Sequence, residues 1–79
     1  MATTEITRSI DARGMACPGP LMALIGAIRQ GNVGDLFEVL SSDEGSKTDI
    51  PAWVEKARHE LVEVVAGDGH ARFVVRKAR

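Results

Sequence analysis

The chain has 79 residues, 44% of them hydrophobic and 27% charged, so it has room for one small domain, which we expect to span residues 1–79. Ten basic and eleven acidic side chains give a net charge of −1, which excludes the positive surface of a general nucleic-acid binder. The sequence contains no apolar run of the ~18 residues that span a bilayer, and it begins without a secretory signal. We therefore expect a cytoplasmic protein that contacts neither nucleic acid nor membrane.

The first half of the chain predicts a strand and a helix. Residues 5–10 are rich in β-branched side chains and predict a strand, which residues 11–14 then break. An apolar stretch follows from Cys17-Pro18-Gly19-Pro20 to Gly31, with prolines that the first turn of a helix tolerates. Its apolar residues recur at helical spacing: Leu21, Leu24, Ile25 and Ile28. Gly31 suits the position after the last turn, and Gly26 weakens the helix by ~1 kcal/mol relative to alanine.

A turn at residues 32–35 leads to a predicted strand over residues 36–40 and a polar loop over residues 41–45. A second helix is predicted to begin near Ser46 to Asp49, and either residue is a suitable N-cap. Pro51 is expected in its first turn. The apolar face again has helical spacing: Ile50, Trp53, Val54 and Ala57.

Two strands close the chain. Residues 61–65 predict a strand whose weak alternation suggests burial on both faces, residues 67–69 a hairpin turn, and residues 71–76 the last strand. The end of the chain is basic and is interpreted either as a solvated strand face and tail or as a weak docking patch: Arg72, Arg76, Lys77 and Arg79.

The element order is therefore β-α-β-α-β-β. It predicts an α+β fold, a two-layer α/β sandwich in which a four-stranded mixed sheet carries both helices on one face. The other face is left to solvent or to a partner.

Cys17 is the one residue to which we assign chemistry. A single cysteine excludes an internal disulfide and a multi-cysteine metal site. The start of a helix stabilises an anion, so the thiol pKa is expected to be lowered, while Pro18 and Pro20 stiffen the junction and hold the cysteine outside the helix. Arg13 lies close enough in sequence to add positive potential. The alternative is that Cys17 is a small buried apolar residue.

Four other polar side chains have ordinary structural explanations. Asp11 and Asp49 are interpreted as a turn former and a helix cap, with docking of a partner as the alternative. His59 and His70 are expected on the surface. Together with Cys17 they match no recognised zinc spacing, so we expect no metal and no cofactor.

Residues 10–21, which read IDARGMACPGPL, resemble the CPxP signature of the TusA-like (SirA/YedF-like) sulfur-carrier proteins. The resemblance covers roughly residues 8–77. It continues through Gly34-Asp35 and through residues 42–46, 49–53, 59–61 and 73–77.

The resemblance implies the β-α-β-α-β-β sandwich. It also implies a sulfur carrier, which would act as a sulfurtransferase in that it passes sulfur from one protein to another. Cys17 would accept sulfane sulfur as a persulfide from a rhodanese or a cysteine desulfurase and pass it to a DsrE-like acceptor protein. The supporting residues would be Arg13, Gly14, Pro18, Gly19 and Pro20. Met15 and Leu21 would form an apolar collar beside the thiol or pack the helix start, and the protein would act as a monomer.

The sulfur would serve tRNA thiolation, cofactor biosynthesis or dissimilatory sulfur oxidation. Many members carry Lys or Arg in the middle of the first helix, where this chain has Ile25 and Gly26. That departure weakens the link to tRNA thiolation. The sequences of residues 17–22 and 41–43 look most like those of members of the sulfur-oxidation branch. The alternatives are a non-catalytic interaction or regulatory module and a cysteine redox sensor.

Overall fold

A computed structural model describes residues 6–16, 18–67 and 69–79. Its elements follow the predicted order: β1 (Arg8–Asp11), α1 (Gly19–Gln30), β2 (Leu36–Ser41), α2 (Ser46–Lys56), β3 (Glu60–Gly67) and β4 (His70–Arg76). Of the predicted first strand, residue 5 lies outside the described residues. The strand itself begins at Arg8, which pairs with Phe37, and ends one residue later than predicted, at Asp11. None of the described helices is long and apolar enough to cross a bilayer.

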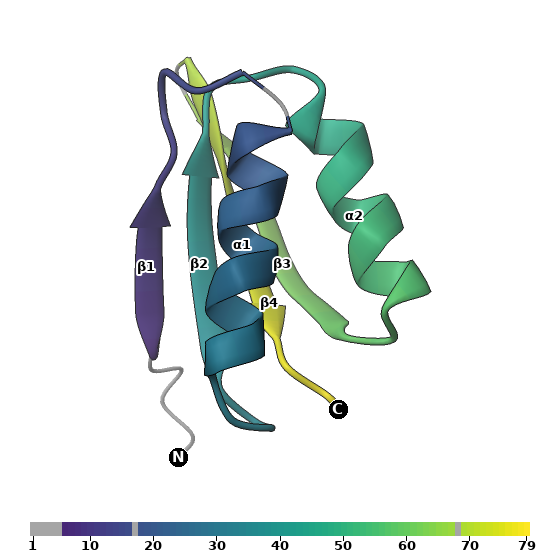
Figure 1. Ribbon diagram of the computed structural model, residues 1–79. Coiled ribbons are helices and arrows are strands. Elements are labelled where there is room, and N and C mark those ends of the chain that lie inside the picture. The colour runs from purple at the N-terminus through teal and green to yellow at the C-terminus, as the bar shows by residue number, and fades with distance from the viewer. Residues whose placement is uncertain (1–5, 17, 68) are drawn as a thin grey trace.

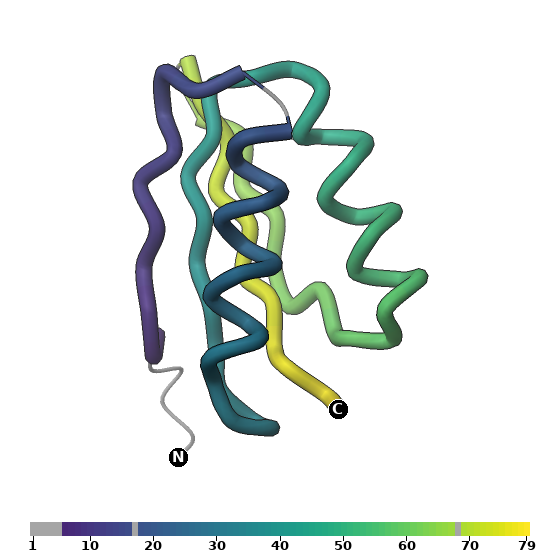
Figure 2. Tube along the Cα trace, in the orientation of Figure 1, coloured from purple at the N-terminus to yellow at the C-terminus, as the bar shows by residue number. Residues whose placement is uncertain are grey.

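The strands form one mixed sheet in the order β1-β2-β4-β3. β1 runs parallel to β2, whereas β4 is antiparallel to both β2 and β3. Both helices lie on the same face of this sheet (Figure 1), with α1 against β1 and β2 and α2 against β3 and β4. The tube in Figure 2 shows the two helices side by side in front of the sheet. The predicted two-layer α+β sandwich is confirmed.

The position of β3 differs from the sequence-based expectation. β3 is an edge strand, and Val62, Val64 and Val65 are 41–48% exposed, so the expectation of burial on both faces is wrong for this strand. β4 instead lies between β2 and β3, and its adjacent Val74 and Val75 are both fully buried. A sequence pattern reports burial but not strand order, and here the last strand takes the central place.

The core lies between the sheet and the two helices. The two phenylalanines, Phe37 of β2 and Phe73 of β4, are almost fully buried there, and Trp53 packs on its margin. Aliphatic side chains fill the remainder: Leu24, Ala27 and Ile28 from α1, Ile50 and Val54 from α2, and Val39, Ala71 and Val75 from the sheet. Removing these side chains from water is the main stabilising contribution to a domain of this size.

The opposite face of the sheet carries charged side chains that pair with one another across neighbouring strands. Arg72 of β4 pairs with Glu38 of β2 and, at 3.4 Å, with Glu63 of β3, while Arg76 pairs with Glu60. Hydrogen bonds from Ser9 and from Arg72 lower the pKa of Glu38. These pairs account for Arg72 and Arg76, two members of the predicted basic patch, as a cross-strand network.

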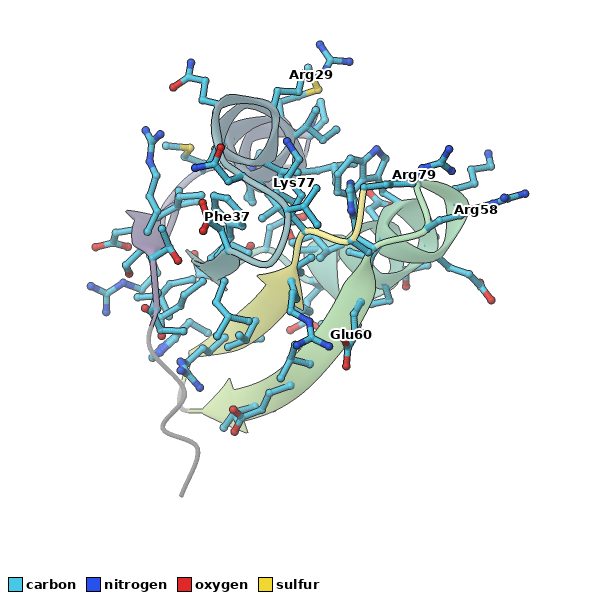
Figure 3. The ribbon with its side chains drawn as sticks, turned by 90° about the horizontal axis from the view of Figure 1, so that it is seen from below. Arg29, Phe37, Arg58, Glu60, Lys77 and Arg79 are labelled. Atoms are coloured by element: carbon cyan, nitrogen blue, oxygen red, sulfur yellow. The ribbon has the colours of Figure 1, made fainter. Side chains whose placement is uncertain are left out.

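Lys77, a third member, caps the C-terminus of α1. Its ammonium group donates hydrogen bonds to the carbonyls of Ile28 at 2.8 Å and Gly31 at 2.9 Å. A cation is favoured at this end of a helix because the last carbonyls are unpaired and carry the negative end of the dipole. Figure 3 shows Lys77 at this end of the molecule together with Phe37.

Gly31 is required for a different reason than the one predicted. Its φ of −97° lies outside the left-handed region, so the backbone after the helix does not itself require a glycine at this position. A Cβ at residue 31 would instead collide with the buried ring of Phe37. Tight packing, rather than backbone conformation, therefore accounts for this glycine.

The start of α2 also differs from expectation. Gly45 is the N-cap, so the prediction that Ser46 or Asp49 caps this helix is wrong. Ser46 is the first helical residue and is fully buried, with its hydroxyl oxygen 2.7 Å from that of Ser41. Because this hydroxyl pair is buried, α2 begins at Ser46, one residue earlier than it would if Ser46 were the N-cap. Pro51 consequently lies inside the helix, not in its first turn.

Alanine substitutions at Gly26 within α1 and at Gly31, the C-cap of this helix, are expected to change stability in opposite directions. Gly26→Ala should raise the free energy of unfolding by about 0.5–1 kcal/mol, because no atom lies within 4 Å of its added Cβ and the helix gains propensity. Gly31→Ala should lower it by about 1–3 kcal/mol, because Phe37 must move. Urea unfolding followed by circular dichroism measures both. A stabilising Gly31→Ala would contradict the packing argument.

Candidate functional site

The segment that carries Cys17 lies at the end of the sheet where both helices begin. β1 and β2 are parallel and therefore end on the same side, which brings residues 12–16 and Pro18 beside residues 42–45 (Figure 1). Cys17 itself lies outside the described residues. In the sequence it directly precedes Pro18, the N-cap of α1, so the residues on either side of it define the site.

The segment starts with a paired aspartate and arginine. The Asp11 carboxylate accepts hydrogen bonds from the Arg13 backbone N–H at 3.2 Å and from Nε and Nη2 of its guanidinium at 2.8 and 2.9 Å. These hydrogen bonds lower the pKa of Asp11 from its usual 3.8 to about 2 and raise that of Arg13. Asp11 is the turn former that the sequence predicts. The positive charge of Arg13 is balanced by its neighbour.

Gly14 ties this segment to the loop after β2. Its φ of +88° is a backbone conformation that glycine adopts without strain. In this conformation its N–H donates a hydrogen bond of 2.9 Å to the hydroxyl oxygen of Ser42. Nothing in the sequence marks Ser42 as a partner of Gly14, because the two residues are 28 positions apart and belong to different loops.

The start of α1 is held by close backbone contacts. The Gly19 N–H donates to the carbonyl of Ala16 at 2.8 Å, and the Met22 N–H to that of Pro18 at 2.8 Å. Gly19 is the first helical residue although Pro20 follows it, and a residue before proline ordinarily avoids the helical region. A Cβ on Gly19 would lie 3.2 Å from the Cβ of Met15, so the glycine admits the Met15 side chain. Pro20 is fully buried in the first turn.

Two methionines supply exposed apolar surface beside the segment. Met15 is 46% and Met22 58% exposed, whereas Leu21 is partly buried against the core. Of the predicted collar, therefore, Met15 faces solvent and Leu21 packs the helix start. Sequence reasoning missed Met22, although its place off the apolar face of α1 was a usable signal.

The two histidines lie at opposite ends of the β3–β4 hairpin. His70 opens β4 opposite Gly67, whereas His59 precedes Glu60, which pairs with Arg76. The Ala78 N–H donates to Nδ1 of His59 at 3.1 Å, and the ring packs 5.5 Å from that of Trp53. Burial is the main cause that lowers the pKa of His59, and the positive charges of Lys77 and Arg79 lower it further. The two imidazoles cannot share one metal ion, and the described residues contain no metal-binding cluster of three His, Cys, Asp or Glu side chains.

A mixed four-stranded sheet with two helices on one face is an architecture that a solved structure shares. A crystal structure of a SirA-like protein from Desulfitobacterium hafniense has the same fold, with a TM-score of 0.81 at 23% identity over 92% of this chain and all of that one.

Similarity in sequence extends over nearly the whole chain. A protein of Archaeoglobus fulgidus named "Putative sulfur carrier protein" is 56% identical over 70 residues, 89% of this chain and 96% of that protein. The sulfur carrier protein TusA of Pseudomonas aeruginosa is 33% identical over 75 residues, 95% of each chain. The sulfurtransferase TusA family matches residues 8–77. The chain belongs to the TusA sulfurtransferase family.

Removing the Arg13 side chain is expected to raise the pKa of Asp11 toward 3.8, because its main stabilising hydrogen bonds are lost. In the wild type the folded-state pKa lies below the unfolded one. The pair therefore stabilises the fold above about pH 4, and this contribution is lost as the pH falls toward 2. Carbon NMR titration of the Asp11 carboxyl in wild type and Arg13→Ala measures the shift, with Arg29→Ala as control. Equal midpoints in wild type and Arg13→Ala would contradict the pairing.

Proposed function

We propose that Cys17 carries sulfur as a persulfide, which it accepts from a donor protein and passes to an acceptor protein. The observation that carries the proposal is the segment Ala16-Cys17-Pro18-Gly19-Pro20 at the start of α1, in a chain that the TusA family matches over residues 8–77. Residues 1–79 would act as one sulfur-carrier domain and as a monomer.

The surroundings of the segment suit this chemistry. Arg13, Gly14, Met15, Ala16 and Pro18 are all exposed, so a partner protein can approach the chain on both sides of Cys17. The first turn of α1 contains no acidic residue, so the positive end of the helix dipole is not opposed there by a carboxylate. A thiolate or persulfide anion held at such a position is stabilised, which lowers the pKa of the thiol.

The transfer consists of two exchanges at sulfur. In the first, the Cys17 thiolate attacks the outer sulfur of a donor persulfide, an S–S bond to Cys17 forms, and the donor cysteine leaves as a thiolate. In the second, an acceptor cysteine thiolate attacks the outer sulfur on Cys17, and the Cys17 thiolate leaves. Each step makes one S–S bond and breaks another, so no external oxidant or reductant is needed.

The partners would be a rhodanese or a cysteine desulfurase as donor and a DsrE-like protein as acceptor. Met15 and Met22 would provide the adaptable apolar contact with both, as flexible methionine side chains do on other interaction surfaces. Gly26 is exposed, with no atom within 4 Å of the position a Cβ would take, so the middle of α1 offers a partner no basic side chain there. This surface favours the sulfur-oxidation branch over tRNA thiolation.

Intact-protein mass spectrometry tests the carrier. After incubation with a rhodanese and thiosulfate, the wild-type chain should gain one sulfur atom that a reductant removes, and Cys17→Ser should gain none. Because Cys17 is the only cysteine, the gain is assigned without ambiguity. Loading by a cysteine desulfurase but not by the rhodanese would keep the carrier and reject the sulfur-oxidation branch. Loading by neither donor would overturn the proposal.

A further inference from the structure

The hydroxyl of Ser42 is the contact by which another element holds the segment that leads to Cys17. Among the described residues, the bond from the Gly14 N–H is the hydrogen bond that joins residues 13–16 to a part of the chain beyond β1 and α1. The other bonds of this segment are local: Arg13 to Asp11, Met15 to Ala12, and Ala16 to Gly19.

We propose that Ser42 is a positioning residue for Cys17, acting through Gly14. The inference rests on the proposed function of Cys17 and deepens it. Gly14 is three residues before Cys17, and its N–H reaches Ser42 in the backbone conformation with a φ of +88°. The hydroxyl thereby determines the direction in which the chain leaves β1 and approaches the start of α1.

Thiol reactivity is sensitive to this direction. The stabilisation of an anion by a helix dipole decreases within the first turn, so a displacement of a few ångströms weakens it. Without the Ser42 hydroxyl, the Gly14 N–H would bind water. Among the described residues, the segment would then keep its local hydrogen bonds and the packing of Met15 on Gly19. The thiolate of Cys17 would then be less favoured, and its pKa would rise.

The contact is not needed for the stability of the fold. Gly14 and Ser42 are both exposed, and Ser42 lines an open hollow of about 90 Å³ that continues to Lys47 and His70. Water can therefore replace the hydroxyl at Gly14, which limits the cost to a small fraction of a buried hydrogen bond. A positioning role and a structural role thus predict different results for the same variant.

The test compares Ser42→Ala with Ser42→Thr, which keeps a hydroxyl, and with Ser9→Ala, which removes an exposed hydroxyl of β1 that is bonded to Glu38 of β2 and not to the segment. The readout is the pH profile of iodoacetamide alkylation of Cys17, with the urea unfolding midpoint measured in parallel. For Ser42→Ala the profile should shift to higher pH, and alkylation below its midpoint should slow by about twofold to fivefold. Ser42→Thr and Ser9→Ala should match the alkylation profile of the wild type, and the unfolding midpoints of Ser42→Ala and Ser42→Thr should agree with that of the wild type.

Three results would overturn the inference: an unshifted profile for Ser42→Ala, the same shift for Ser9→Ala, or a shift that follows a loss of stability. The alkylation profile needs no sulfur donor, so this failure is distinct from failure of the proposed function. A wild-type chain that takes up sulfur while Ser42→Ala alkylates normally would reject only the positioning role. A shifted profile in a chain that no donor loads would reject only the carrier.

Discussion

The parallel pairing of β1 with β2 is the constraint on which the rest of the structure depends. Two parallel neighbours cannot be joined by a tight turn, so the chain must cross back over the sheet, and α1 makes this crossing. The pairing also makes both strands end on the same side. The segment before α1 and the loop before α2 therefore meet, and Gly14 can bind Ser42.

Most charged groups near the sheet are committed to partners within the chain. Arg72 and Arg76 join strands on the outer face, Lys77 caps α1, and Arg13 pairs with Asp11. Exposed pairs of this kind contribute little stability individually. Of these pairs, Arg13 with Asp11 lies in the segment before α1, where the exposed apolar side chains are Met15 and Met22 and the arginine is balanced by a carboxylate.

Local patterns predicted much of the fold. Helical spacing in α1 and α2, β-branched side chains in the first strand, and turn residues between elements were enough for the element order and the two-layer architecture. The errors came where long-range packing overrides local preference. Ser46 is buried against Ser41 instead of capping α2, Gly31 makes room for Phe37, and β4 rather than β3 occupies the centre of the sheet.

In the candidate site too, some features could be predicted from the sequence and others only from the structure. The sequence by itself determined the nucleophile that we propose, because a lone cysteine before a proline-containing helix start is a local pattern. It also determined the turn at Asp11, which is local as well, and the family resemblance, which motifs along residues 8–77 carry. Only the tertiary structure decided that Ser42 holds Gly14 and that β4 takes the centre of the sheet. Both depend on which strands and loops meet when the chain folds, and no local pattern encodes that meeting.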